Sequence, residues 1–362
     1  MASEKEAGGQ ELRTRGPGVQ EYGLLDCIVQ VVAVYIWLGW LCTIALVPLL
    51  LVFLSWPARL TVGAIVLAAG LVPIPRFQDK LGPLYSAYGN FLMRRAAQYF
   101  SLRVQMTASA DDTFQKLHAD GTPVVIGLEP HAVIPFSIFF CHDALETLPL
   151  RDARGLMSSI LFMIPGMRQT YRSVAASAAD KKTMYKLLDK GISCGLIPGG
   201  VQEVKLLNKG SKKDLYLYLS KRLGFVKVAL EKGAPVVPAF CFGILETYSW
   251  WIVPGTIAAK IGRFIGFMPM LYFGAMGIPL GIPKKVPLTV VVGEPIKGPP
   301  LPKVPSGCDA GAVLTDEQEK QLSDEINDIV AATHAKYVKA MVTLFEENKQ
   351  RLNYGEVMLH IE

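Results

Sequence analysis

The sequence lacks the cysteine patterns by which proteins bind zinc or build disulfide frameworks. It contains no Cys-x-x-Cys pair and no cluster of histidine and cysteine at the spacing of metal ligands. Its six cysteines are dispersed along the chain: Cys27, Cys42, Cys141, Cys194, Cys241 and Cys308. We therefore expect buried, reduced thiols, no metal site, and a reducing compartment for most of the chain.

Charge is also scarce, since charged residues make up 19% of the 362 residues and hydrophobic residues 51%. This composition is too apolar for an average soluble enzyme and too charged for a bundle of many membrane helices, so it favours a globular protein with a membrane anchor. The formal net charge of +6 suits an anionic lipid surface, an acidic cofactor or nucleic acid equally. Charge alone does not choose among these partners.

The segment from Cys27 to Trp56 contains no charged residue, and it is longer than the roughly 20 residues that a membrane helix needs. A second apolar run, residues 60–75, would span roughly 24 Å as a helix and needs a thinned bilayer or a re-entrant path. Basic residues follow this run, which favours a hairpin with both ends in the cytosol. We predict a disordered tail over 1–24 and an anchor hairpin over 25–76. The alternative is a buried helical hairpin of a soluble domain.

Downstream of residue 76, short β-branched runs alternate with helical stretches, which predicts an α/β layer structure. The expected strands are 123–128, 192–197, 235–240 and 288–292, and the expected helices are 178–190 and 215–232. This domain should extend over 77–311. Residues 312–362 carry apolar side chains at helical spacing, so we expect an amphipathic helix that packs on the domain or, as the alternative, contacts lipid.

The stretch LEPHAVIPF, residues 128–136, places His131 at the end of an expected strand, where α/β proteins present reactive groups. A neutral imidazole accepts a proton near neutral pH and can act as a general base. Pro130 fixes the turn, and Glu129 would share a side with His131 if the chain stays extended. The alternative is a structural histidine held by hydrogen bonds.

A second strand end carries the sequence IPGGVQE, residues 197–203. Gly199 and Gly200 would let backbone amides approach an oxyanion or a phosphate, and Glu203 adds an acid. A simple hairpin turn is the alternative. Basic residues follow, Lys205 and Lys227 among them, and they suit the phosphates of a nucleotide-bearing acyl carrier unless they are only a solvated face.

Ser193 lies in a Gly-x-Ser-x-Gly pattern, but the expected helix precedes it and the expected strand follows it. A hydrolase nucleophile needs the reverse order. We do not expect Ser193 to be a nucleophile.

The ordered set of motifs resembles the type 2 diacylglycerol acyltransferase family. The motifs are an apolar hairpin, EPHA at 129–132, Arg172-Ser173 with Lys181-Lys182, IPGGVQEV at 197–204, LGFVKVAL at 223–230, VVPAFCFG at 236–243 and VVVGEPI at 290–296. Plant and algal members carry EPHS at the first motif and animal members His-Pro-His-Gly, so EPHA is similar to the plant form and departs from it at Ala132.

The resemblance implies a glycerolipid-acyltransferase-like α/β domain with an N-terminal transmembrane helical hairpin. It implies transfer of a fatty acyl group from acyl-CoA to diacylglycerol, forming triacylglycerol, with acyl-CoA as co-substrate and no separate cofactor. The expected place is the endoplasmic reticulum membrane, with the catalytic domain facing the cytosol, and lipid droplets. Membrane lipid and a second copy of the chain are the expected partners, and nucleic acid is not.

The resemblance also implies roles for single residues. Related glycerophosphate acyltransferases pair a base and an orienting acid as His-x-x-x-x-Asp, but the fifth residue after His131 is Phe136. Glu129 and Glu203 are therefore the candidates for the orienting carboxylate. Amides of Gly199 and Gly200 would hold the oxyanion.

The CoA phosphates would be held by basic residues on three segments, Arg172, Lys205 and Lys227.

Three other functions compete with this one. The first is an acyltransferase of the same family that uses monoacylglycerol or a long-chain alcohol. The second is a non-catalytic membrane scaffold at lipid droplets. The third is a serine lipase that uses Ser193.

Overall fold

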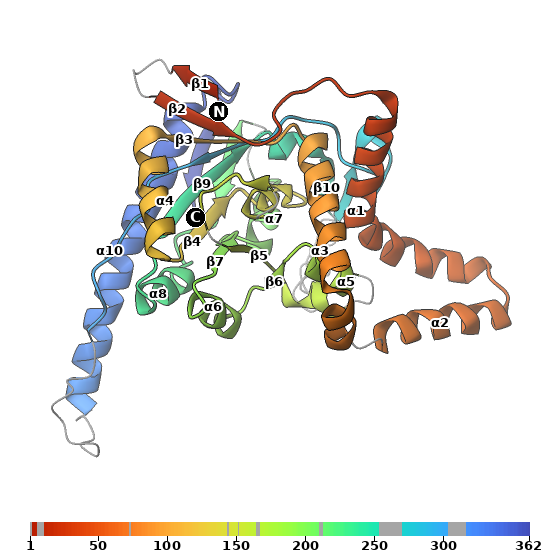
Figure 1. Cartoon of the computed structure of the whole chain (residues 1–362), viewed down its shortest axis with the longest axis horizontal. Coiled ribbons are helices and arrows are strands. Elements are labelled where there is room, and N and C mark those ends of the chain that lie inside the picture. Colours follow the sequence, from red (N-terminus) through yellow and green to blue (C-terminus); the bar gives the residue numbers. More distant parts are fainter. Residues whose placement is uncertain are drawn as a thin grey trace.

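The computed structural model describes residues 2–5, 11–71, 74–142, 145–150, 152–163, 167–209, 213–252, 270–302 and 316–362. Nine of its described strands form a mixed sheet in the order β1-β2-β3-β12-β9-β4-β7-β5-β6, which crosses the molecule in Figure 1. The strands are β1 (Ala2–Lys5), β2 (Glu11–Arg15), β3 (Arg103–Thr107), β12 (Thr289–Val292), β9 (Val236–Phe242), β4 (Val125–Glu129), β7 (Ser193–Leu196), β5 (Ala153–Met157) and β6 (Ser177–Ala178). The central strand β4 runs parallel to both of its neighbours, β9 and β7.

Helices cover both faces of the sheet. The described α-helices are α1 (Leu24–Phe53), α2 (Trp56–Leu71), α3 (Ile74–Tyr99), α4 (Ala108–Asp120), α5 (Met167–Ser173), α6 (Lys181–Leu188), α7 (Val201–Leu206), α8 (Gly224–Glu231) and α10 (Asp316–Asn348). One core contains side chains of α1, α3 and α4, and the other contains those of α6, α8 and α10. Successive strand side chains point to opposite faces, so β4 supplies Ile126 and Leu128 to the first core and Val125 to the second.

The four expected strands are confirmed as β4, β7, β9 and β12, and the expected helix 178–190 is confirmed in a shorter form as α6. The expected helix 215–232 is wrong in its first part. Residues Asp214–Leu217 form strand β8, and only Gly224–Glu231 is helical. Leu215 and Leu217 are buried while Tyr216 between them is half-buried, an alternation with the period of a strand that the helical interpretation overlooked.

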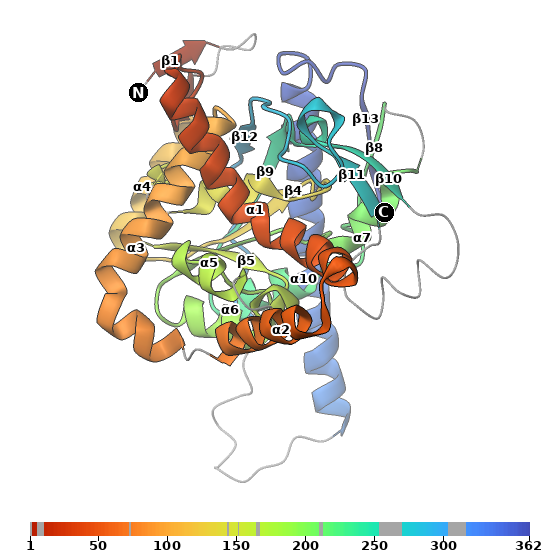
Figure 2. The same cartoon turned by 90° about the vertical axis from the view of Figure 1, so that its right-hand side faces the viewer.

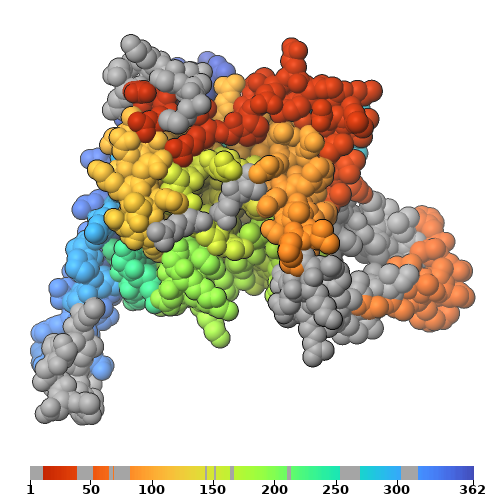
Figure 3. Space-filling model, viewed as in Figure 1, coloured from red at the N-terminus to blue at the C-terminus, as the bar shows by residue number. Residues whose placement is uncertain are grey.

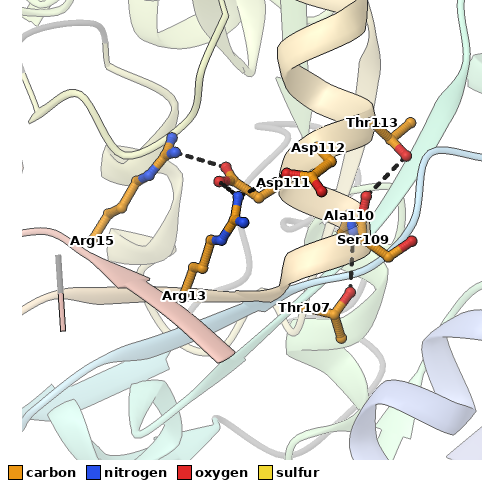
Figure 4. A network of polar contacts seen from close by, with 8 residues as sticks. All are labelled: Arg13, Arg15, Thr107, Ser109, Ala110, Asp111, Asp112 and Thr113. Atoms are coloured by element: carbon orange, nitrogen blue, oxygen red, sulfur yellow. Dashed lines mark hydrogen bonds and ion pairs between the residues drawn. The ribbon is translucent and has the colours of Figure 1, made fainter. Parts of the chain in front are cut away.

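Residues 11–15, within the tail predicted to be disordered over 1–24, are instead ordered, because they form β2, which pairs antiparallel with β3 and extends the sheet. Figure 4 shows what fixes it there. Arg13 and Arg15 of β2 both contact the buried carboxylate of Asp111 on α4, each at 2.7 Å, and Arg13 also contacts Asp112 at 2.8 Å. The carboxylate of Asp111 is 1% exposed, and its charge-assisted ion pairs attach β2 to α4.

The predicted anchor segment folds as two helices, α1 and α2, that meet at residues 54–55. The first half of α1 belongs to the domain, since Trp37 packs against Phe136, Phe139 and Tyr171 in an aromatic cluster. Helix α2 projects away from the sheet in Figure 1. No helix within the described residues combines the length and the hydropathy of a membrane span. The side chains at 39–51 lie outside the described residues, and the transmembrane hairpin stays a prediction.

The C-terminal helix α10 packs on the domain, as expected. Its side chains Val330, Tyr337, Met341 and Phe345 are buried in the second core, and Figures 1 and 2 show the helix running along the sheet and beyond it. After it, β13 (Met358–Ile361) pairs in parallel with β8. The predicted boundary at residue 311 falls within 303–315, outside the described residues.

Candidate active site

The candidate site lies at the carboxyl end of β4. All five residues of this strand are buried, because it lies between two parallel neighbours with a core on each face. The chain then leaves the sheet through Pro130, which is buried, and His131, which is partly exposed. We call residues 130–135 the His131 loop. The structure thus places His131 at a strand end, where the sequence predicted it.

The imidazole of His131 is oriented by a backbone carbonyl. Its Nδ1 lies 3.0 Å from the carbonyl oxygen of Ala132, and because a carbonyl only accepts, Nδ1 must carry the hydrogen. The backbone of Ala132 has a φ of 54°, in the left-handed region, which costs energy for a residue with a side chain. The Nε2 lone pair is therefore the one that can take a proton.

Glu203, predicted as a candidate to orient the ring, instead holds the backbone of the loop. Its Oε2 accepts a hydrogen bond of 2.9 Å from the His131 amide, and its Oε1 accepts another of 2.9 Å from the Tyr218 amide at β8. The expectation that a carboxylate orients the imidazole is therefore not met in the described contacts. The reason is geometric, since the two oxygens of Glu203 are directed at backbone amides, while Nδ1 of the ring is directed at the Ala132 carbonyl.

Glu129, the other candidate, holds the bend at 199–200. Its Oε1 accepts a hydrogen bond of 3.0 Å from the Gly199 amide. That amide is consequently occupied, which corrects the prediction that Gly199 would donate to an oxyanion. Gly200, with a φ of 53° in the left-handed region, precedes α7, and among the described residues we find no acceptor for its amide. Gly200 remains the candidate donor of the pair.

Glu129 and Glu203, which we call the carboxyl pair, thus join two strand ends. Burial raises the pKa of both carboxyls, and the charge of Glu203 raises that of Glu129 further. Arg222 donates to the Gly199 carbonyl at 3.3 Å. Its charge lowers the pKa of both carboxyls but does not cancel the increase. Two adjacent buried carboxyls cannot both ionise easily. The two carboxyls are hydrogen-bonded to one another, and these effects favour a proton shared by the pair. Oε2 of Glu129 is buried and accepts no amide or hydroxyl hydrogen bond from the described residues.

The three basic residues predicted to hold CoA phosphates lie on separate helices. Arg172 is exposed at the end of α5, Lys227 is half-buried on α8, and Lys205 on α7 donates to Gln202 at 2.9 Å. No hydrogen bond or ion pair found in the described ranges joins any of them to His131. Their role in binding CoA stays a prediction. The cation that contacts the bend at 199–200 is Arg222, and its position within a basic stretch of sequence did not reveal this contact.

Ser193 has a structural task. It is 2% exposed at the start of β7, and its Oγ accepts a hydrogen bond of 3.1 Å from the Val124 amide. A nucleophile must be reachable by substrate, so the serine lipase alternative has no support here. The described residues also contain no group of three or more side chains that could hold a metal ion.

A hollow of about 400 Å³ opens between the end of β2 and helix α3. It is lined by Thr14, Arg15, Gly16, Pro17, Arg94, Gln98, Leu145 and Glu146. In Figure 3 the N-terminal segment, in red, crosses above α3 and α4. None of the predicted site residues lines this hollow.

The acid side of the pH profile should report His131. Burial lowers the pKa of this imidazole below its usual 6.5, and the Ala132 carbonyl partly offsets that effect. A base works only when unprotonated, so acyl transfer should be lost as the pH falls through the lowered pKa and not at 6.5. Measuring kcat/KM from pH 4.5 to 8 tests this. A decline already centred at or above pH 6.5 would contradict it.

Comparison with known protein sequences places the chain in a family. A sequence model described as "Diacylglycerol acyltransferase" matches residues 82–306, more than half of the chain. "Diacylglycerol O-acyltransferase 2" of Danio rerio is 27% identical over 256 residues, which cover 64% of this chain and 62% of that protein. "Acyl-CoA wax alcohol acyltransferase 2" of Mus musculus is 26% identical over 281 residues, covering 73% of this chain and 75% of that protein.

A solved structure is also similar, the 1-acyl-sn-glycerophosphate acyltransferase PlsC of Thermotoga maritima. The similarity covers 85% of this chain and 96% of that one at 13% identity, and its TM-score of 0.35 is too low to establish a common fold. The family match is independent of it and includes both strand ends of the site. The chain belongs to the diacylglycerol acyltransferase family.

Proposed function

We propose that the chain transfers a fatty acyl group from acyl-CoA to the free hydroxyl of diacylglycerol, which forms triacylglycerol and free CoA. The observation that carries this proposal is the arrangement of His131. Its Nδ1–H is held by a carbonyl, its Nε2 is the basic nitrogen, and its backbone is tied through Glu203 to the segment that carries the Gly199–Gly200 bend.

In the proposed reaction, Nε2 of His131 takes the hydroxyl proton of diacylglycerol while that oxygen attacks the thioester carbonyl. A new C–O bond forms, and the carbonyl electron pair moves to oxygen. The Gly200 amide is the proposed donor to this oxyanion. When the carbonyl reforms, the C–S bond breaks and CoA leaves as a thiolate, which takes the proton from His131. No covalent acyl-enzyme is required.

Acyl-CoA binding is proposed for basic side chains on three helices, α5, α7 and α8. Arg172, Lys205 and Lys227 are retained as ligands of the CoA phosphates, and a net charge of +6 favours the encounter with an anionic co-substrate. Arg222 is not included, because its guanidinium already contacts the Gly199 carbonyl and stacks over Tyr218 at 5.1 Å.

Membrane association, at the endoplasmic reticulum with the domain facing the cytosol, is proposed from exposed apolar side chains. On α1 these are Leu24, Leu25, Ile28 and Val32, and on the neighbouring α3 they are Leu84, Tyr88 and Phe91. Each is more than 40% exposed. Exposed large apolar side chains on adjacent helices mark a contact with a membrane or with another protein, and we favour the membrane because diacylglycerol is dissolved in the bilayer.

A long-chain alcohol is the second candidate for the acyl acceptor. The similar proteins include wax alcohol acyltransferases of mouse at 26% and 28% identity, a level no different from the diacylglycerol acyltransferases. Sequence similarity therefore does not choose between diacylglycerol and a long-chain alcohol.

The test is an acceptor panel. Microsomes that contain the chain should be supplied with labelled oleoyl-CoA and, separately, with diacylglycerol, monoacylglycerol or hexadecanol, and the products separated by polarity. We expect labelled triacylglycerol as the main product. A wax ester as the main product would reassign the acceptor, and no labelled ester with any alcohol would support a non-catalytic scaffold instead.

A further inference from the structure

Tyr337 of α10 contacts β4, the strand that ends at the His131 loop. This residue is fully buried, and its hydroxyl lies so close to Gly127 of β4 that a Cβ at that position would overlap it. A glycine within a strand often marks the close approach of another group. Gly127 makes room for a hydroxyl that comes from a helix outside the family match at 82–306.

The geometry of β4 directs this hydroxyl toward Glu129. Residues two apart on a strand lie on the same face and about 7 Å apart, so Gly127 and Glu129 point to the same side. Val125, two residues before Gly127, packs in the same core as Tyr337. A glutamate side chain extended along the strand covers much of that separation. The Tyr337 hydroxyl and the Glu129 carboxyl therefore face one another beneath the His131 loop.

Both groups are buried polar atoms that can make a further hydrogen bond. The Tyr337 hydroxyl has no partner among the described residues, and Oε2 of Glu129 accepts from no described amide or hydroxyl, although the Glu129 carboxyl also hydrogen-bonds that of Glu203. Buried polar groups are almost always satisfied, by protein or by an ordered water, because leaving one unpaired costs about 1 to 3 kcal/mol. One is a donor and the other an oxygen that can accept, and they share one side of the strand.

We propose that Tyr337 is a positioning residue of the acyltransferase, whose hydroxyl donates to Oε2 of Glu129, directly or through one water. The carboxyl pair then links four elements. Helix α10 holds Glu129, Glu129 holds the Gly199 amide, and Glu203 holds the amides of His131 and Tyr218. Tyr337 touches no substrate in this arrangement. It fixes the carboxyl that aligns the bend with the base, a role that rests on the proposed function.

The surroundings of the pair decide how its proton responds to pH. Arg222 is the cation that faces it, and His131 lies above it. From α10, Tyr337 faces it, and His334 lies one turn away with ring centroids 6.4 Å apart. Because burial and the charge of Glu203 raise the pKa of Glu129, the shared proton is lost at a higher pH than an ordinary glutamate would lose it. Two buried carboxylates would then repel each other and separate the bend from the loop.

The test is Tyr337→Phe, with Tyr99→Phe as the matched control. Tyr99 is also buried, but its hydroxyl donates to the Pro283 carbonyl at 2.7 Å. For Tyr337→Phe we expect about a tenfold lower kcat with little change in KM for oleoyl-CoA. The alkaline decline of activity should move to higher pH, because a donor that stabilised the ionised pair is gone. Tyr99→Phe should keep the wild-type pH profile.

Hydrogen exchange of a peptide covering residues 128–136 gives a readout that does not depend on activity. It should be faster in Tyr337→Phe than in the wild type, and unchanged in Tyr99→Phe. If the wild type acylates no acceptor, the proposed function fails while this measurement still decides the inference. An unchanged exchange rate would overturn it, and so would a kcat within twofold of wild type with an unmoved alkaline limb.

Discussion

Replacing His131 with Ala should lower kcat for triacylglycerol formation by about 10²- to 10⁴-fold, the contribution expected of a general base. The variant should otherwise keep its architecture. Glu203 binds the backbone amide of residue 131 and not its ring, so Ala retains that hydrogen bond. The change therefore removes the Nε2 base and leaves the loop in place. Initial rates with labelled oleoyl-CoA and dioleoylglycerol measure the loss.

His118→Ala provides the matched control, since His118 is an exposed imidazole on α4, away from the end of β4. It should retain wild-type rates. Membrane fractionation and the thermal unfolding midpoint should be the same for both variants, which separates lost chemistry from lost folding. A His131→Ala protein with near-normal triacylglycerol synthesis would refute the assignment of the base.

The position of the base could be predicted from the sequence because it depends on local patterns. Short β-branched runs indicate buried strands, and β4 and β7 formed where such runs occur. The sequence places His131 and the Gly199–Gly200 bend just after these two strands. Because β4 and β7 are parallel neighbours, their carboxyl ends meet at the same edge of the sheet. Proximity of the two motifs follows from this topology.

The hydrogen bonds within the site could not be predicted in the same way. Whether the Gly199 amide points to a ligand or to Glu129 depends on the path of the chain before α7, and residue type does not encode that path. The same is true of the ring of His131, which is oriented by a left-handed residue, Ala132, and not by an acid. These details are set by backbone dihedrals that a motif leaves open.

Contacts between segments that lie far apart in the chain could not be predicted from the sequence either. Strand β8 is stabilised by pairing with β13, more than a hundred residues later, so its own alternating pattern was read as part of a helix. Tyr337 lies in the segment that was expected only to form an amphipathic helix, although Gly127 within an expected strand was a signal of close approach. Contacts between distant segments decide both cases, and one sequence does not pair them.

The Gly199→Ala variant should lose about 10²-fold in kcat, because it acts on the alignment of the whole site. A Cβ on Gly199 would overlap the carboxyl group of Glu203. That carboxyl cannot simply swing aside, since its two oxygens bind the amides of His131 and Tyr218. Displacing it shifts the His131 loop relative to the bend, and an error of about 1 Å in such a constellation can cost 10²-fold in rate.

Gly224→Ala is the matched glycine control, because a Cβ there meets nothing within 4 Å. It should keep the wild-type kcat. Gly199→Ala should also unfold more easily, by about 1 to 3 kcal/mol for an overpacked site, as measured by urea denaturation. Full activity in Gly199→Ala would mean that Glu203 moves freely. The carboxyl pair would then not be what holds His131, and the base would have to be positioned by the Ala132 carbonyl and the packing of the loop alone.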